Sequence, residues 1–275
     1  MVLSLTLAHP LDFAMIYTCY EMIRDCRAGR PEGWSYFLKQ YVPAMRGLST
    51  HYFPERAGDP ALIDRVLVRL YGSESSLFQS LEPAPERAFV AELRQHVIAA
   101  VEADRAGTPP QVSIDIEALG AALEPLTLTE KLVVWFESMR YRAADAARML
   151  RMSPQTAEKI RGRGAELVRG SVDSWSVTLL ADNGAALGRE ASARAGKDCL
   201  PAKTFFDVIE GRATWRGREE MERHVKNCWH CLDHYCRLLE VVDVVRIAKP
   251  LSEAETESYQ RLLGIQPAKR SFWRR

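Results

Sequence analysis

The sequence lacks the features that mark membrane and exported proteins. No stretch of its 275 residues reaches the roughly 18 uninterrupted apolar residues that a membrane helix needs. Residues 1–14 are apolar, but they have no basic start and they include Pro10 and Asp12, unlike a secretory signal peptide. We therefore expect a cytoplasmic protein with no membrane partner.

The sequence also lacks the short motifs of common catalytic sites. It contains no glycine-rich phosphate loop, no G-x-S-x-G nucleophile elbow and no H-E-x-x-H zinc-protease motif. The formal net charge is +1, so the charge balance of the whole chain excludes no class of partner. These absences lead us to expect a protein that is not an enzyme.

The cysteines are spread unevenly, and the late ones form a pattern typical of metal ligands. His224, Cys228 and Cys231 are spaced H-x3-C-x2-C, which places all three on one face of a helix. Without an export signal the thiols are expected to be reduced, which favours metal binding over disulfides. With Cys199 as the expected fourth ligand, the prediction is a closed structural Zn²⁺ site. The alternative is that these residues fill the core of an amphipathic helix, because free cysteine is often buried.

The chain reads as helical throughout. The alternating, β-branched runs that indicate strands are absent from the first hundred residues, where apolar side chains recur at helical spacing. The predicted fold is all-α, with two small helical domains and a small three-helix zinc-binding domain. The expected order is a first domain at 11–106, a linker at 107–118, a second domain at 119–170, a connector at 171–197, the zinc-binding domain at 198–248 and a basic tail at 249–275.

Residues 143–169 carry the pattern of a helix-turn-helix. A short helix is followed by a turn, and Ser153 can cap a second helix that has Pro154 at its first position. Within 148–169, six basic side chains face two acidic ones, a surplus suited to a phosphate backbone. The alternative is a solvated, arginine-rich helix face. The residues expected to contact DNA are Arg148, Arg151, Ser153, Gln155, Thr156, Lys159, Arg161 and Arg163.

Further stretches carry a resemblance to a known family. They are the aromatic-rich run 34–41, the amphipathic run 62–70, the helical stretch 89–105, and Asp145-Ala146-Ala147 in the helix-turn-helix. Together with Glu210-Gly211 and the cysteine and histidine pattern, they resemble a bacterial extracytoplasmic-function (ECF) RNA polymerase sigma factor with a fused C-terminal anti-sigma-type zinc-finger domain. The resemblance covers most of residues 30–170 and residues 198–242.

The resemblance implies a function in transcription initiation. Such a factor directs core RNA polymerase to specific promoters, and here the zinc domain in cis, or a separate regulator, would modulate it. Residues 143–169 would read promoter DNA in the major groove, and Arg94 would lie against the opened DNA strands. The residues implied to bind polymerase are Asp59, Leu62, Asp64, Arg65 and Arg69.

The sequence departs from the family at the implied polymerase-binding helix. Ala61 and Arg65 occupy positions that are usually acidic or amide, and reversed charge at a binding surface lowers affinity and association rate. The alternative function is a degenerate sigma-like and anti-sigma-like interaction module that regulates transcription without initiating it. A third class, a metal-dependent hydrolase, would need an open position on the metal.

Overall fold

The computed structural model describes residues 17–72, 78, 86–104, 114–169 and 185–266. Within these ranges the chain forms thirteen α-helices and one short 3-10 helix, and it contains no strand. The prediction of an all-α fold is confirmed. In the same ranges, no helix is long and apolar enough to cross a membrane. The predicted linker, connector and tail lie partly outside the described residues.

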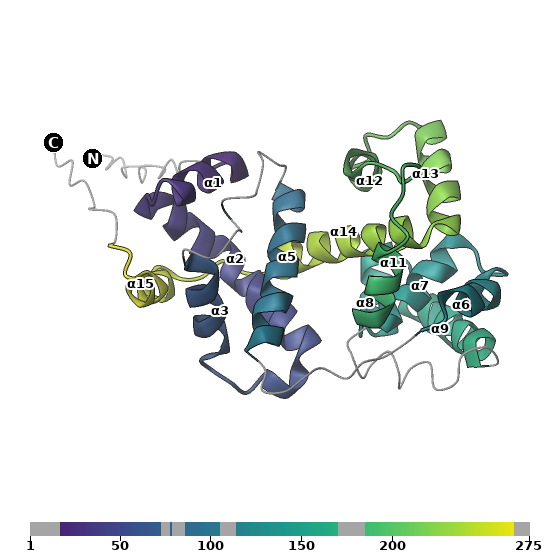
Figure 1. The fold of residues 1–275 in the computed structure, drawn as a ribbon, viewed down its shortest axis with the longest axis horizontal. Helices are drawn as coiled ribbons and strands as arrows, with labels where there is room; N and C mark the ends of the chain where they lie inside the picture. Colours follow the sequence, from purple (N-terminus) through teal and green to yellow (C-terminus); the bar gives the residue numbers. More distant parts are fainter. Residues whose placement is uncertain (1–16, 73–77, 79–85, 105–113, 170–184, 267–275) are drawn as a thin grey trace, which may run out of the picture.

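The helices form two lobes, and one long helix runs from one lobe to the other (Figure 1). The N-terminal lobe contains α1 (Cys19–Arg27), α2 (Pro31–Tyr52), the 3-10 helix η1 (Pro54–Arg56), α3 (Leu62–Tyr71), α5 (Glu86–Ala103) and α15 (Glu253–Leu262). The C-terminal lobe contains α6 (Ile116–Leu123), α7 (Leu128–Ser138), α8 (Ala143–Leu150), α9 (Pro154–Arg169), α11 (Ala185–Ser192), α12 (Ala202–Ile209) and α13 (Trp215–Asn227). The connecting helix is α14 (Trp229–Ile247).

Helix α14 contributes apolar side chains to both cores. Leu232 and Leu238 are buried in the core of the C-terminal lobe, whereas Val241 is buried in the core of the N-terminal lobe. Each fully buried side chain of this kind contributes about 1.5–3 kcal/mol. The helices of the predicted zinc-binding domain share one core with the helix-turn-helix unit, so the three expected units pack around two main cores, and a third, small cluster of alanines lies between α8 and α9.

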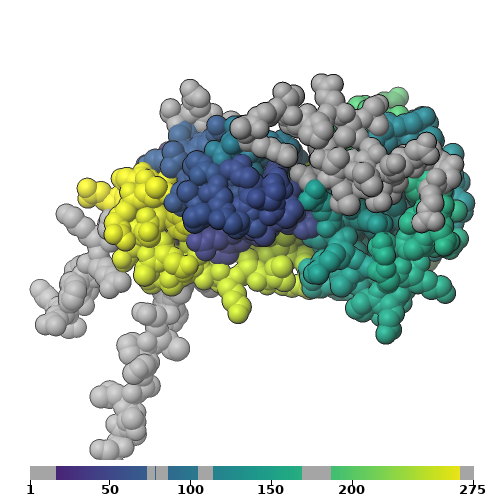
Figure 2. Space-filling view, turned by 90° about the horizontal axis from the view of Figure 1, so that it is seen from below, coloured from purple at the N-terminus to yellow at the C-terminus, as the bar shows by residue number. Residues whose placement is uncertain are grey.

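The C-terminal tail docks on the N-terminal lobe at a proline inside α2. Pro43 has no backbone N–H, so the carbonyl of Lys39, four residues earlier, loses its partner within the helix. The backbone N–H of Leu251 donates to that carbonyl at 2.9 Å. Leu251 and Tyr259 are buried in the N-terminal core, and Figure 2 shows this C-terminal segment, in yellow, against the N-terminal lobe. The region predicted as a basic tail contains helix α15, which belongs to this lobe.

Helices α8 and α9 form a helix-turn-helix at the predicted place. Arg151 ends α8 in the left-handed conformation, with φ at 57°. The hydroxyl of Ser153 accepts a hydrogen bond from the N–H of Thr156 at 3.1 Å, which is the expected helix cap. Helix α9 packs closely on α7 at Gly164, where an added Cβ would lie 2.3 Å from Cγ2 of Val134. The position of the second helix therefore depends on a glycine.

Replacing Gly164 by alanine tests this close approach. Gly164→Ala is expected to lower the free energy of unfolding by about 1–3 kcal/mol, the usual effect of overpacking a buried contact. Gly162→Ala is the matched control, because a Cβ there meets no atom within 4 Å. The control is expected to gain roughly 0.5–1 kcal/mol, since alanine is the better helix former. Chemical denaturation measures both variants, and equal effects would contradict the close packing of α9 on α7.

Candidate metal centre and nucleic-acid interface

Three cysteines meet where α13 ends and α14 begins. The sulfur atoms of Cys199, Cys228 and Cys231 all lie within 4.8 Å of one another, and the Sγ atoms of Cys199 and Cys228 are 3.9 Å apart. Two sulfurs that bind one tetrahedral ion at about 2.3 Å are separated by about 3.8 Å. The spacing of the three sulfurs therefore fits a single metal ion, as the sequence led us to expect.

The imidazole of His224 lies beside this cluster at the end of α13. Its Nε2 atom is 3.2 Å from Sγ of Cys231. The structure thus brings the three predicted cysteine ligands together and places the fourth predicted ligand, His224, against one of them, Cys231. Three sulfurs and one imidazole nitrogen form a donor set of the kind that structural zinc sites use.

The ligands do not share one continuous helix. Cys228 has φ −121° and ψ 110°, an extended conformation that separates α13 from α14. His224 comes from the last turn of α13, whereas Cys231 comes from the first turn of α14. The single helix face that the spacing indicated is not formed, because the chain bends at the middle ligand. The free N–H groups at the start of α14 favour negatively charged thiolates there.

Backbone N–H groups point at two of the sulfurs. Gly196 donates to Sγ of Cys199 at 3.3 Å, and Leu200 donates to Sγ of Cys231 at 3.4 Å. The bond from Leu200 favours the thiolate of Cys231, which is the form that binds a metal. Burial acts in the opposite direction and raises the pKa of Cys231 to about 12. A divalent cation among the sulfurs would supply the positive charge that burial makes necessary.

The metal centre is fixed to the helix-turn-helix unit through the residues that flank Cys228. Trp229 stacks on Trp135 of α7, with ring centroids 5.3 Å apart. The buried amine of Lys131 donates to the backbone carbonyl of Lys226 at 3.1 Å and so caps the end of α13. Its Nζ also lies 5.8 Å from the ring centre of Trp229. The helix break that presents the ligands is therefore held from α7.

Metal analysis of purified variants tests the ligand assignment. The wild-type protein is expected to carry one equivalent of a thiophilic divalent ion, and Cys228→Ser to lose it to a chelator at least tenfold more readily. Cys19→Ser is the control, because Cys19 lies in the N-terminal lobe, away from the cluster. Cys199→Ser should behave like Cys228→Ser. Full metal retention by Cys199→Ser would contradict the four-ligand set.

The residues expected to contact DNA fall into two groups. Arg161 pairs with Glu158 and lies 3.4 Å from Glu137, and Arg163 lies 2.7 Å from Glu130, so both guanidinium groups are engaged by carboxylates. The other group is exposed around the turn and the first half of α9, where a groove-binding helix contacts bases. Its members are Arg151, Ser153, Gln155, Thr156 and Lys159.

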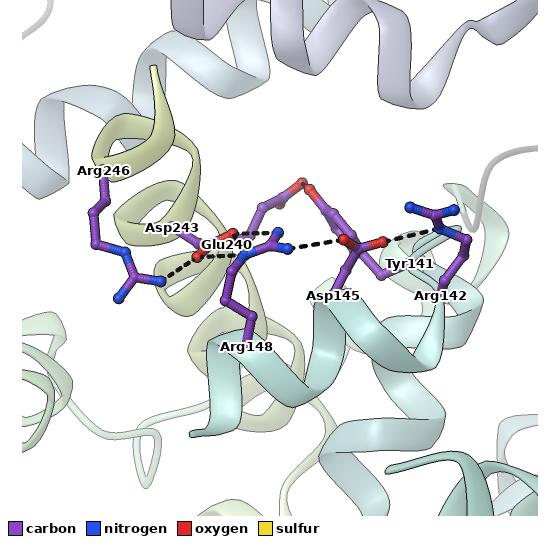
Figure 3. Close-up of polar contacts among 7 residues, drawn as sticks. All are labelled: Tyr141, Arg142, Asp145, Arg148, Glu240, Asp243 and Arg246. Carbon is purple, nitrogen blue, oxygen red and sulfur yellow. Dashed lines mark hydrogen bonds and ion pairs between the residues drawn. The ribbon is translucent and has the colours of Figure 1, made fainter. Parts of the chain in front are cut away.

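Arg148, at the end of α8, is held by α14. Its Nη2 lies 2.7 Å from Oδ2 of Asp243, and its Nε lies 3.1 and 3.0 Å from the two carboxylate oxygens (Figure 3). Its Nη1 donates to Asp145 at 3.0 Å. Hydrogen bonding to Asp243 is the main cause that raises the pKa of Arg148. The guanidinium group of Arg148 is thus bound by two carboxylates of the protein, one from Asp243 and one from Asp145.

The residues implied to bind polymerase do not all reach the surface. Leu62 is 4% exposed and belongs to the N-terminal core, so its side chain has no free face for a partner. The guanidinium of Arg65 bridges Asp59 at 2.5 Å and Asp104 at 3.0 Å. Asp64 lines a groove whose other wall is α15. Arg69 is exposed.

The exposed apolar side chains of α3 were not expected from the sequence. Val68 is 51% exposed and Tyr71 is 41% exposed, at positions one turn apart on the same helix. Both lie on the helix that was implied to bind polymerase. The sequence of α3 does indicate them, because its apolar residues are too many to lie on one buried helix face.

A buried polar cluster joins the two lobes and was also not expected. Glu240 of α14 is fully buried, and its carboxylate accepts hydrogen bonds from Tyr52 and Tyr141, each at 2.6 Å. Arg94 of α5 lies 2.5 Å from the same carboxylate. Burial alone would raise the pKa of Glu240, but the charge of Arg94 and the tyrosine hydroxyls hold it below its ordinary value. Arg94 is 3% exposed, so it does not face solvent as the resemblance implied.

The cluster also contains a direct contact between the lobes. His51 of α2 stacks on Tyr141, with ring centroids 3.8 Å apart. Its Nε2 lies 2.8 Å from the carbonyl of Met139, which follows α7. The sequence signal for this junction was the presence of Glu240 and Asp243 in the apolar run 238–245, where charged side chains need buried partners.

A scan against models of known protein families, a search of curated proteins and a search of solved structures each find no match to this chain. Its function must therefore be inferred from its own residues.

Proposed function

We propose that this chain is a transcription initiation factor similar to the ECF sigma factors, held in a closed form by its C-terminal unit, the predicted zinc-binding domain at residues 198–248. The N-terminal lobe would engage core RNA polymerase, and α9 would lie in the major groove of promoter DNA. The metal centre would hold Zn²⁺ as a structural ion. The chain would carry out no catalytic step itself.

The helix-turn-helix supports the DNA-binding part of this proposal. In complexes of this motif the second helix enters the major groove and its first residues contact base edges. At the corresponding place, α9 exposes Gln155, Thr156 and Lys159, and Arg151 is exposed in the turn before it. Amide, hydroxyl and cationic groups are those that bind bases and phosphates.

The ligand set supports a structural zinc ion. Three cysteines and one histidine fill a tetrahedral coordination sphere, whereas catalytic zinc keeps a position for water. His224, Cys228 and Cys231 come from two helices that meet at a sharp break. An ion at that place would hold the break in position, and a metal-dependent hydrolase is the less favoured function because four protein ligands would leave no position open for water.

Glu240 is the single observation that carries the proposal of a closed form. The carboxylate belongs to the C-terminal unit, yet Tyr52 and Arg94 bind it from the N-terminal lobe and Tyr141 binds it from the C-terminal lobe. Removing one partner from a buried ion pair costs about 3–5 kcal/mol. The lobes cannot separate around α14 without breaking part of this cluster. In the family that the sequence resembles, a zinc domain of this type lies between the two sigma domains.

The engaged state of α3 favours a second candidate function. With Leu62 buried and Arg65 bound to Asp59 and Asp104, little of the implied polymerase surface is free. An interaction module that regulates transcription without initiating it fits these contacts. What remains available on α3 is the exposed pair Val68 and Tyr71, which can bind an apolar partner surface.

Binding of purified bacterial core RNA polymerase to the full chain separates these functions. Glu240→Gln keeps the hydrogen bonds to the tyrosines but removes the charge opposite Arg94. We expect this variant to bind polymerase roughly 10–100-fold more tightly than the wild type, because about 1.4 kcal/mol of weakened closure is worth tenfold in affinity.

The matched control is Glu220→Gln, which removes the same charge from the exposed face of α13. The control should bind polymerase like the wild type. Equal binding by all three proteins would show that the C-terminal unit does not inhibit. If none of them binds, the initiation factor is the wrong conclusion and the interaction module is the better one.

A further inference from the structure

We infer that Asp243 occupies the place of a DNA phosphate against Arg148, so that the C-terminal unit and DNA compete for the helix-turn-helix. This inference rests on the proposed function, because it requires that α8 and α9 bind duplex DNA. The regulated contact is the one that Arg148 makes either with the carboxylate of Asp243 or with a phosphodiester group of DNA.

The geometry of the pair is that of an anion held by an arginine fork. The Nε and Nη2 atoms of Arg148 donate to the two carboxylate oxygens of Asp243 at 2.7 to 3.1 Å. Bidentate pairing of this kind is the mode in which arginine binds both carboxylates and phosphates. A carboxylate in this fork therefore uses the same donors that a phosphate would use.

The location of Arg148 is that of a backbone contact. It lies in the last turn of α8, the first helix of the helix-turn-helix, and in complexes of this motif the first helix crosses the DNA backbone. Asp243 reaches it from α14, which packs against α8. Arg148 thus belongs to the helix-turn-helix and Asp243 belongs to the C-terminal unit, and the proposed function requires these two parts to separate.

The carboxylate sits in a groove that suits an anion. The groove has a volume of about 510 Å³ and lies between α7, α8 and the helices of the metal-centre unit. Asp243 is 3% exposed, and Arg246 closes its other side at 2.7 Å. Four arginines line the groove against two carboxylates; the arginines are Arg148, Arg151, Arg218 and Arg246. This excess of positive charge favours an anion in the groove even when Asp243 moves away.

The first half of α9 stays open in the same structure. Gln155, Thr156 and Lys159 are exposed while Asp243 holds Arg148. The C-terminal unit therefore prevents Arg148 from binding a DNA phosphate, and it leaves Gln155, Thr156 and Lys159 accessible to bases. The expected result is weaker binding to DNA of every sequence, with unchanged preference between sequences.

The test is the affinity of the full chain for a short duplex of mixed sequence, measured by fluorescence anisotropy over a range of salt concentrations. Asp243→Asn is expected to bind roughly 3–10-fold more tightly than the wild type at low salt, because Arg148 becomes available to a phosphate. Its affinity should also fall more steeply with salt, by about one unit of log–log slope.

Glu222→Gln is the matched control. Glu222 lines the same groove and carries the same charge, but it pairs with Arg218 instead of Arg148. This control is expected to bind like the wild type, and equal gains in Asp243→Asn and Glu222→Gln would overturn the inference. Adding Arg148→Ala to Asp243→Asn should remove the gain, and a gain that persists in this double variant would also overturn it.

Lys159→Ala distinguishes failure of the inference from failure of the proposed function. If Lys159→Ala weakens binding but Asp243→Asn gives no gain, the helix-turn-helix binds DNA and the competition is wrong. If neither the wild type nor any variant binds duplex, both the DNA-binding function and the competition are wrong.

Hydrogen exchange on the wild-type chain gives a second test, which does not depend on whether a substituted protein folds. Saturating duplex is expected to speed exchange of the backbone amides of α14 around Asp243, because DNA displaces the carboxylate that ties this helix to α8. Amides of α1, which lies in the other lobe, serve as the internal control. Unchanged or slower exchange around Asp243 would overturn the inference.

Discussion

A carboxylate taken out of water has to be paired, and the pairing of Glu240 decides how the two lobes are arranged. Its desolvation costs several kcal/mol unless cationic and hydrogen-bonding groups replace the lost water. Those groups come from both lobes: Arg94 and Tyr52 from one, Tyr141 from the other. Because α14 also buries apolar side chains in both cores, apolar packing holds the lobes together as well as this polar cluster.

The candidate metal centre and this junction lie on the same helix, α14. Cys231 lies in the first turn of α14, Glu240 lies near its middle, and Asp243 lies one turn later. The ligand break is held to α7 by the stacking of Trp229 on Trp135. One helix thus carries two of the candidate ligands at its N-terminal end, together with the residues that join the lobes.

Local chemistry could be predicted from the sequence, and long-range pairing could not. The cap at Ser153 and the cluster of Cys199, Cys228 and Cys231 depend on neighbours within a few residues or on rare side chains, and the structure contains them. The spacing of His224, Cys228 and Cys231 indicated one helix face, because periodicity cannot distinguish a continuous helix from two helices that meet at a ligand. The partners of Glu240 could not be predicted, because Tyr52, Arg94 and Tyr141 are distant from it in the sequence. A tyrosine or an arginine on an amphipathic helix does not indicate which distant residue it will contact.

The hydrogen bond between Leu251 and the carbonyl freed by Pro43 has a consequence for how the chain is made. Lys39, whose carbonyl is involved, also pairs with Glu253, 214 residues later in the sequence. At synthesis rates of about 5–20 residues per second, the N-terminal lobe waits roughly 10–40 s on the ribosome for the segment that completes it. The first lobe to be translated is therefore the last to finish folding, and a chain that stops short of residue 251 leaves α2 with an unpaired carbonyl and an uncovered apolar face.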